Sequence, residues 1–441
     1  MDQRNQQNVG FYEWLGLNKA PNWVKSRALG GFAGFLITLA ILLLIVLFML
    51  ALAAAFVVVY QTISPSEDVE TPNLGVGALL TALLSAPFII WRTMVAQWTV
   101  DHQRESLFND KLNAASKDLA AWREVTRVVG EDGDERVLTT REPDLVTRAT
   151  AIDRLYGLIK ERPSEASRIA AMLSLYVREH TVQVGDKIPD APPVPVPENA
   201  TPDELLEWAR GLKVARSDLQ KAVQAIGRIR DILGVELEDN AIDLRGANLQ
   251  AMDLSGLNFG KGQWHGAQMQ GANLVGAQMQ GTILTEAQMH GAELSSAQMQ
   301  GAILVSAQMQ GAELSFAQMQ GAGLSDAQMQ GANLASAQMQ GAEFSSAQMQ
   351  GANLSLAQMQ GAAFIDMYIS EREIYPHIKD AFGDGTNQID PNLVPTGDDP
   401  WPDHWPTESL HWNDFNRAWR DWVAQNHPDV LQYLPDYVRN A

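Results

Sequence analysis

A repeat of five residues runs without a slip through 242–366. From Leu244, every fifth residue up to Phe364 is large and apolar, twenty-five in one register. A helix would need apolar residues three and four apart, and a strand would need strict alternation, so neither fits. Within one unit, however, Ala272 and Leu274 lie on the same side of an extended segment. Three extended residues followed by a corner predict a square coil, in which four units make one turn of twenty residues.

This coil places the large residues inside, in columns of residues twenty apart. Two faces carry Met and two carry Leu or an aromatic residue. Met fills irregular gaps, so we interpret its columns as packing rather than as a metal site. Gly262 stands where other units have Ala, which leaves room for Trp264. On the outside, Gln268, Gln288 and Gln308 are expected to form a polar ladder. The predicted core residues are Leu244, Leu249, Leu254, Phe259, Trp264, Met269, Leu274, Met279, Leu284, Met289, Leu294, Met299, Leu304, Met309, Leu314, Met319, Leu324, Met329, Leu334, Met339, Phe344, Met349, Leu354, Met359 and Phe364.

The Ala-Asn-Leu-x-x units at 247–251, 272–276, 332–336 and 352–356 resemble the pentapeptide-repeat family. That resemblance implies a right-handed quadrilateral β-helix, with the large residue and the preceding Ala inside. A helical stretch upstream resembles a segment of membrane-anchored bacterial members of the family. The residues that carry this second resemblance are Arg148, Ala151, Ile152, Leu155 and Tyr176–Glu179.

Two apolar runs near the start of the chain predict a transmembrane hairpin at 29–98. The first, 31–60, exceeds the roughly 20 residues that span a bilayer, and the second, 74–91, nearly does so. The loop between them has acids and no Lys or Arg, whereas basic residues flank both runs. The positive-inside rule therefore puts both termini in the cytoplasm. Together with the resemblance to membrane-anchored bacterial members, this implies a multi-pass protein of the bacterial plasma (inner) membrane.

The segments between the hairpin and the coil are predicted to be mainly helical. Residues 93–129 predict a helix continuing from the second span, and amphipathic spacing predicts two more over 144–161 and 164–180. A Pro-rich linker follows, and Thr201, with Pro202 and Glu204, has the pattern of a helix start with a capping box. The fold class is thus mixed: two transmembrane α-helices, an α-helical cytoplasmic linker domain, a quadrilateral β-helix and an α-helical or irregular Trp-rich tail. The predicted divisions are 1–28 cytoplasmic segment, 29–98 hairpin, 99–184 helical domain, 185–202 linker, 203–241 helical N-cap, 242–366 β-helix and 367–441 C-terminal cap or tail.

Both ends of such a coil expose core and unpaired backbone edges, so each end needs a cap. Residues 216–240 are the candidate at one end and the Trp-rich tail at the other, with a helix expected over 408–425. The alternative is that the tail binds a partner, because Trp anchors interfaces. Candidate partner-binding residues are Phe316, Leu356, Trp401, Trp405, Trp412, Trp419 and Trp422.

No group of residues in the sequence predicts catalysis. The chain has no Cys, its His residues have no metal-ligand spacing, and no phosphate loop or nucleophile motif is present. Asp380, Asp384, Asn387 and Asp390 hint at a calcium loop, but their spacing does not fit one. We therefore expect no catalytic residues, no metal and no cofactor.

Three classes of function remain open. The first is a membrane-tethered, non-enzymatic scaffold whose rigid surface binds an unidentified protein. The second is the DNA mimicry that the family resemblance suggests, directed at a topoisomerase or other nucleic-acid enzyme. A duplex as long as six coils, roughly 30 Å, would carry about 17 negative charges. Residues 242–366 hold eight acids against Arg245 and Lys261, a net charge of −6, which favours the scaffold.

The third class is an accessory subunit of a membrane enzyme, channel, or signalling or defence complex. The whole chain has a formal charge of −20, so direct nucleic-acid binding is not expected. Paired coils and paired spans are both compatible with a homodimer.

Overall fold

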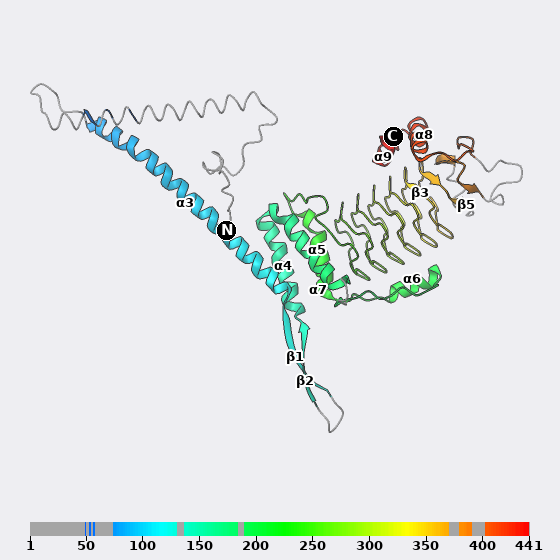
Figure 1. The fold of residues 1–441 in the computed structure, drawn as a ribbon, viewed down its shortest axis with the longest axis horizontal. Helices are drawn as coiled ribbons and strands as arrows, with labels where there is room; N and C mark the ends of the chain where they lie inside the picture. Colours follow the sequence, from blue (N-terminus) through cyan, green and yellow to red (C-terminus); the bar gives the residue numbers. More distant parts are fainter. Residues whose placement is uncertain are drawn as a thin grey trace, which may run out of the picture. The chain divides into compact units, whose positions relative to one another are not determined.

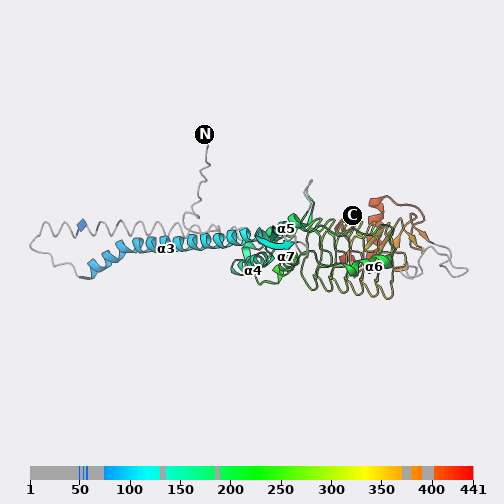
Figure 2. The same ribbon diagram turned by 90° about the horizontal axis from the view of Figure 1, so that it is seen from below.

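The computed structural model describes most of the chain as two compact units, Met1–Lys111 and Leu112–Ala441. Figures 1 and 2 show the described elements in two views. Described residues are 74–129, 136–183, 189–369, 379–389 and 402–440, together with Met49, Ala53, Phe56 and Val57.

The first described helix, α3 (Leu74–Leu119), corrects the predicted transmembrane hairpin. The first apolar run, 31–60, lies almost wholly outside the described residues. The side chains described in α3 lie mainly beyond Trp91, where charged residues such as Arg92 and Asp101 recur. Over the described part of the chain, no helix combines the length and the apolarity that a membrane span needs. On this finding the two transmembrane helices in the fold class, and the multi-pass inner-membrane location built on them, are wrong.

A β-hairpin follows α3 where the sequence predicted more helix. Strand β1 (Trp122–Val129) pairs antiparallel with β2 (Arg136–Pro143) over all eight residues of each strand. The prediction of a helix over 93–129 is therefore wrong beyond Leu119. The sequence of β1 mixes Val and Thr with charged residues without strict alternation, which suits a two-stranded ribbon with both faces near water.

Three helices then form a small bundle around one apolar core. Helix α4 (Leu145–Glu161) and helix α5 (Ala166–Thr181) are joined by the 3₁₀ turn η2 (Pro163–Glu165), close to the predicted bounds. Helix α7 (Ser217–Gly227) packs against both, and the turn η3 (Ile229–Asp231) follows it. The side chains shared by the bundle are fully buried, and include Ile152, Leu155, Ile169, Leu173, Val223 and Ile226.

Residues 242–366 form the predicted coil, called the solenoid below. Parallel backbone bridges join residues twenty apart, from Asp243–Gln263 to Gln338–Gln358. The last coils are regular enough to contain strands β3 (Glu343–Ser345) and β4 (Ala363–Ile365), which pair in parallel. All twenty-five large residues of the register are buried, as are most of the Ala residues two positions before them.

Local contacts explain two details of the solenoid. A Cβ on Gly262 would lie 2.6 Å from Trp264 Nε1, so the small residue makes the space that the indole fills. The outward Gln residues stack, but their amides do not bond directly up the column. Instead, Gln270 Nε2 donates to Gln288 Oε1 at 2.7 Å, and the same diagonal bond recurs along the solenoid.

The Pro-rich linker is held against the first coil. The backbone of Val194 both donates to and accepts from the side chain of Gln250, at 2.8 and 2.9 Å. Helix α6 (Pro202–Gly211) follows, with the predicted capping box between Thr201 and Glu204. It lies beside the coils rather than over their end (Figures 1 and 2).

The N-terminal end of the solenoid is covered by α7 and η3. The Gly227 carbonyl accepts from Asn258 N at 2.9 Å, and Arg230 donates to the Gly260 carbonyl at 2.9 Å. A Cβ on Gly227 would lie 2.7 Å from Phe259, so the helix packs directly on the core. This end cap therefore consists of α7 and η3 and does not include α6.

The C-terminal end continues the coil by two short strand pairs. Strand β6 (Phe382–Gly383) pairs with β4, and β7 (Gln388–Ile389) pairs with β5 (Tyr368–Ile369). Residues 412–439, called the C-terminal segment below, contain α8 (Trp412–Asn426), η6 (Leu431–Tyr433) and α9 (Asp436–Arg439). Its apolar side chains form a second core with Ala363 and Phe382; those side chains are Phe415, Trp419, Val423, Val430, Leu434 and Val438.

Candidate interaction surface

Each coil of the solenoid has four corners. The residues at three of these corners show which sides of the solenoid are covered by other segments of the chain. The first of these columns is Gly271, Gly291, Gly311, Gly331 and Gly351, all with positive φ. Helix α6 lies on it: a Cβ on Gly291 would lie 2.9 Å from the Ala209 side chain, and one on Gly331 would lie 2.9 Å from Pro202. Gly is thus needed here for the approach of α6 as well as for the turn.

A second Gly column is covered by the C-terminal segment. A Cβ on Gly321 would overlap the Tyr433 carbonyl oxygen, and one on Gly361 would lie 3.0 Å from Val430. Trp419 Nε1 also donates to the Gly361 carbonyl at 2.7 Å. Gly301 lies one coil before Gly321 in the same column, and no atom lies within 4 Å of the place where its Cβ would stand.

The third column, called the apolar corner below, carries large apolar side chains in the open. Its residues are Gly276, Ser296, Phe316, Ser336 and Leu356. Phe316 is 60% exposed and Leu356 is 82% exposed, and their φ angles are 59° and 61°. The two side chains are two coils apart, about 10 Å.

Folding does not explain why large apolar side chains stand at these two exposed positions. Left-handed backbone costs a residue other than Gly roughly 1–2 kcal/mol. Neither side chain recovers that cost by burial, and Ser or Gly serves at the other positions of the column. Phe316 and Leu356 are thus the predicted partner-binding residues that the structure leaves available on the solenoid.

The predicted Trp residues divide between core and surface. Trp419 is fully buried, and Trp405 is 3% exposed, with its Nε1 donating to the Ala381 carbonyl at 2.9 Å. The Trp405 ring lies over the end of the solenoid, with its centroid 6.3 Å from that of Phe364. Trp422 is half-buried and stacks on His404 at 4.7 Å.

Only Trp412 among the described Trp residues of the tail is largely open, at 49%. Trp401 lies outside the described residues. Trp405 and Trp419 therefore pack the cap, which favours that interpretation of the tail for these two residues.

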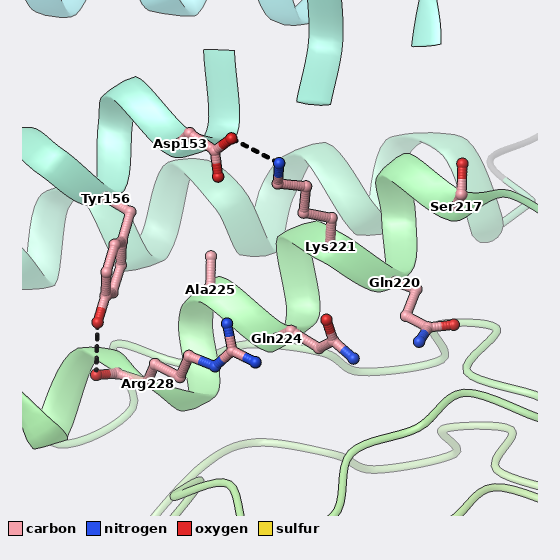
Figure 3. A pocket seen from close by; sticks show the side chains of 8 residues that line it. All are labelled: Asp153, Tyr156, Ser217, Gln220, Lys221, Gln224, Ala225 and Arg228. Carbon is pink, nitrogen blue, oxygen red and sulfur yellow. Dashed lines mark hydrogen bonds and ion pairs between the residues drawn. The ribbon is translucent and has the colours of Figure 1, made fainter. Parts of the chain in front are cut away.

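A polar hollow lies between α4 and α7 (Figure 3). Lys221 Nζ lies 2.5 Å from Asp153, and the Tyr156 hydroxyl points to the Arg228 carbonyl at 3.5 Å. The remaining lining is mostly amide and hydroxyl groups. The hollow thus has a satisfied ion pair and no nucleophile paired with a base.

The upstream motif forms a buried polar network inside the bundle. Arg148 is 1% exposed, donates to the Ala121 carbonyl at 3.0 Å, and lies 3.1 Å from His180 Nε2. The Tyr176 hydroxyl donates to Asp218, and burial together with that carboxylate raises the pKa of Tyr176. These contacts tie α4, α5 and α7 together.

The acidic residues near 384 serve the cap. Asp384 Oδ1 accepts from Thr386 N at 3.0 Å, and its Oδ2 accepts from Leu410 N at 2.8 Å. Asn387 donates to the Phe364 carbonyl at 2.8 Å. Within the described ranges, no three His, Asp or Glu side chains are grouped so that they could hold a metal ion.

The fold defines the class: a four-sided parallel β-solenoid with both ends covered. The family model for pentapeptide repeats matches eight copies, at residues 265–297, 292–327 and 327–364. Residues 265–364 thus consist of pentapeptide repeats. Neither membrane anchoring nor a bacterial origin is supported by the comparisons.

Three solved structures are similar to part of this chain. The pentapeptide repeat protein Rfr23 from the cyanobacterium Cyanothece 51142 is 25% identical over 28% of this chain and 86% of its own, with a TM-score of 0.19. One from the Arabidopsis thaliana thylakoid lumen is 25% identical over 32% and 79%, with a TM-score of 0.18. QnrB1, a plasmid-mediated fluoroquinolone resistance protein, is 14% identical over 28% and 74%, with a TM-score of 0.23. No curated protein matches the chain.

The sequence did not predict that α6 and the C-terminal segment cover two corners of the solenoid. The signal for this covering is the Gly at every tenth residue, which marks two opposite columns where backbone from elsewhere approaches. The period alone does not say which part of the chain, or which partner, makes that approach.

Proposed function

We propose that the protein is a non-enzymatic scaffold, in which the solenoid is a rigid surface that binds a partner protein. The observation that carries this proposal is the apolar corner. Phe316 and Leu356 lie open at left-handed positions on a face that neither α6 nor the C-terminal segment covers.

The chemistry of the corner specifies the kind of contact. Its column has no charged residue, although the chain carries a formal charge of −20. A partner that binds there gains apolar burial, about 25 cal/mol for each Å² removed from water. Because the two side chains are held on a stiff backbone, little ordering free energy is lost on binding.

Quantitative proximity labelling with the full chain tests the proposal. The test variant combines Phe316→Ser and Leu356→Ser, since Ser already stands at 296 and 336 and the fold accommodates it. We expect a set of labelled proteins to be lost from the double variant. The control is Leu233→Ser, which removes a 96% exposed Leu from the turn after η3, outside the apolar corner. An identical set of labelled proteins for the double variant and the unaltered chain would overturn the proposal.

A further inference from the structure

A groove lies between the solenoid and the C-terminal segment, away from the apolar corner. It has a volume of about 730 Å³. One wall is the solenoid face that contains Ile303, Gly323 and Glu343, and the other is made by Trp412, Tyr433 and Tyr437. This volume is in the range of ligand-binding pockets.

The floor of the groove is made by a break in one column of the solenoid. Ile283, Ile303, Gly323, Glu343 and Ala363 are stacked twenty residues apart. No atom lies within 4 Å of the place where a Cβ on Gly323 would stand. The missing side chain therefore leaves a hollow between an Ile and a carboxylate.

Glu343 is the one acid of this column in its later coils, and it is 4% exposed. Its Oε1 accepts from Ser325 Oγ at 3.1 Å, and its Oε2 accepts from the Tyr437 hydroxyl. Burial raises the pKa of Glu343, and these two hydrogen bonds offset part of the rise.

No basic side chain of the described residues forms an ion pair with Glu343. Arg439 also lines the groove, but it pairs with Asp436. A buried carboxylate without a cation is costly, and neutral residues fill the neighbouring positions of the column. The hydroxyl groups of Ser325 and Tyr437 satisfy the oxygens of Glu343 but do not neutralise its charge.

Aromatic rings face the same space. Trp412 is 49% exposed, Tyr437 47% and Tyr433 37%, so each ring presents surface to the solvent. The rings of Trp412 and Tyr437 are nearly parallel, with centroids 5.7 Å apart and an angle of 30°. Faces of Trp and Tyr attract cations within about 6 Å, and most strongly where water is excluded.

We propose that this groove binds a segment of a partner protein through a lysine side chain. The ammonium group neutralises Glu343, and the methylene chain packs against Trp412 and Tyr437. The acidic chain attracts such a segment before contact. This site does not depend on the apolar corner, so either proposal can fail without the other.

Saturation-transfer NMR on the full chain tests the site directly. The probes are the peptides acetyl-Gly-Lys-Gly-amide and acetyl-Gly-norleucine-Gly-amide, which differ by the ammonium group. We expect transfer to the lysine side chain, and binding at least about tenfold weaker for the norleucine peptide, as for the loss of one charge-assisted contact.

Two variants and a control locate the binding. Glu343→Gln keeps the shape and hydrogen bonding of the side chain, and we expect it to weaken lysine binding by about tenfold or more. Trp412→Ala is expected to weaken both peptides, because it removes a wall and leaves the carboxylate. Glu313→Gln removes the same charge from another face of the solenoid and is expected to change nothing. Equal binding of the two peptides, equal binding by the Glu343 and Glu313 variants, or no saturation transfer at all would each overturn the proposal.

Discussion

The inward column around Met309 consists of buried Met side chains, Met289 before it and Met329 after it, which offer no hydrogen bond to a charge. Met309 is fully buried in its column. We expect Met309→Asp to lower the free energy of unfolding by several kcal/mol, roughly 4 or more, because it buries an unpaired carboxylate. Thermal and urea unfolding measure the effect. The control is Gln308→Asp, one residue along and half-buried at the surface, which should cost much less. Equal losses would show that the assignment of inside and outside is wrong.

Glu343 gives the solenoid a pH dependence with a definite sign. Its folded-state pKa is raised above the ordinary value of 4.5, chiefly by burial. Ionisation therefore favours the unfolded chain, so its destabilising effect is absent below that value and grows as pH rises through the folded pKa. The charged or titratable groups that line the groove with it are Tyr433, Asp436, Tyr437 and Arg439.

We expect Glu343→Gln to melt at the same temperature as the unaltered chain near pH 4 and at a higher temperature at pH 7. Differential scanning calorimetry at the two pH values measures the difference. Glu313→Gln, which removes the same charge from another face of the solenoid, is the matched control. A melting temperature that drops at pH 7 in the Glu343 variant would contradict the reasoning.

At the scale of elements, the C-terminal segment is held by contact with corner Gly residues. Gly301 and Gly321 stand in one column with φ of 64° and 66°. An Ala at either position bears the left-handed strain of roughly 1–2 kcal/mol, but only at Gly321 does the new Cβ meet Tyr433. We expect Gly321→Ala to lower the melting temperature more than Gly301→Ala and to expose 412–439 to limited proteolysis. The same proteolysis pattern in both variants would show that the segment is not seated on this column.

The helices that the sequence predicted correctly had clear local signals. Helix α6 has Thr201, Pro202 and Glu204 at its start, and α4 and α5 have apolar residues at helical spacing. The β1–β2 hairpin had a weaker signal. Its strands carry charged residues such as Arg123, Arg127 and Arg141 along their length. In the described part of the chain they pair only with each other, so no buried face imposes a clear alternation.

The solenoid could be predicted from the sequence because every unit has the same pattern. An Ala and a large residue point inward, and a corner follows them. What the sequence could not predict is which element lies on which side. The covering of the Gly columns by α6 and the C-terminal segment is tertiary contact between parts far apart in the chain. The groove could not be predicted for the same reason, since Gly323 and Glu343 become adjacent to Trp412 only through tertiary contact.

At the scale of the whole solenoid, the surface divides by what covers it. Two opposite columns of corners are taken by the chain's own α6 and C-terminal segment. A third is the apolar corner, and the fourth carries polar and acidic residues such as Glu286, Asp326 and Asp366 at positive φ. Outside the groove, a partner that binds a corner of the solenoid therefore meets either the apolar corner or the acidic one, and the two favour partners of different chemistry.

Charge distribution over the solenoid leads to a prediction about nucleic-acid enzymes. A duplex mimic of this length needs about 17 evenly spread negative charges, whereas 242–366 has a net charge of −6. The structure lowers the effective number further, because Asp243 pairs with Arg178 and Arg245, and Glu343 is buried. We therefore expect the full chain to leave DNA supercoiling by a purified topoisomerase unchanged at micromolar concentration, in low and in moderate salt. An unrelated duplex competitor serves as the positive control. Inhibition by the chain that weakens as salt rises would instead show that the acidic corner resembles a DNA backbone to the enzyme, and the scaffold proposal would lose its priority.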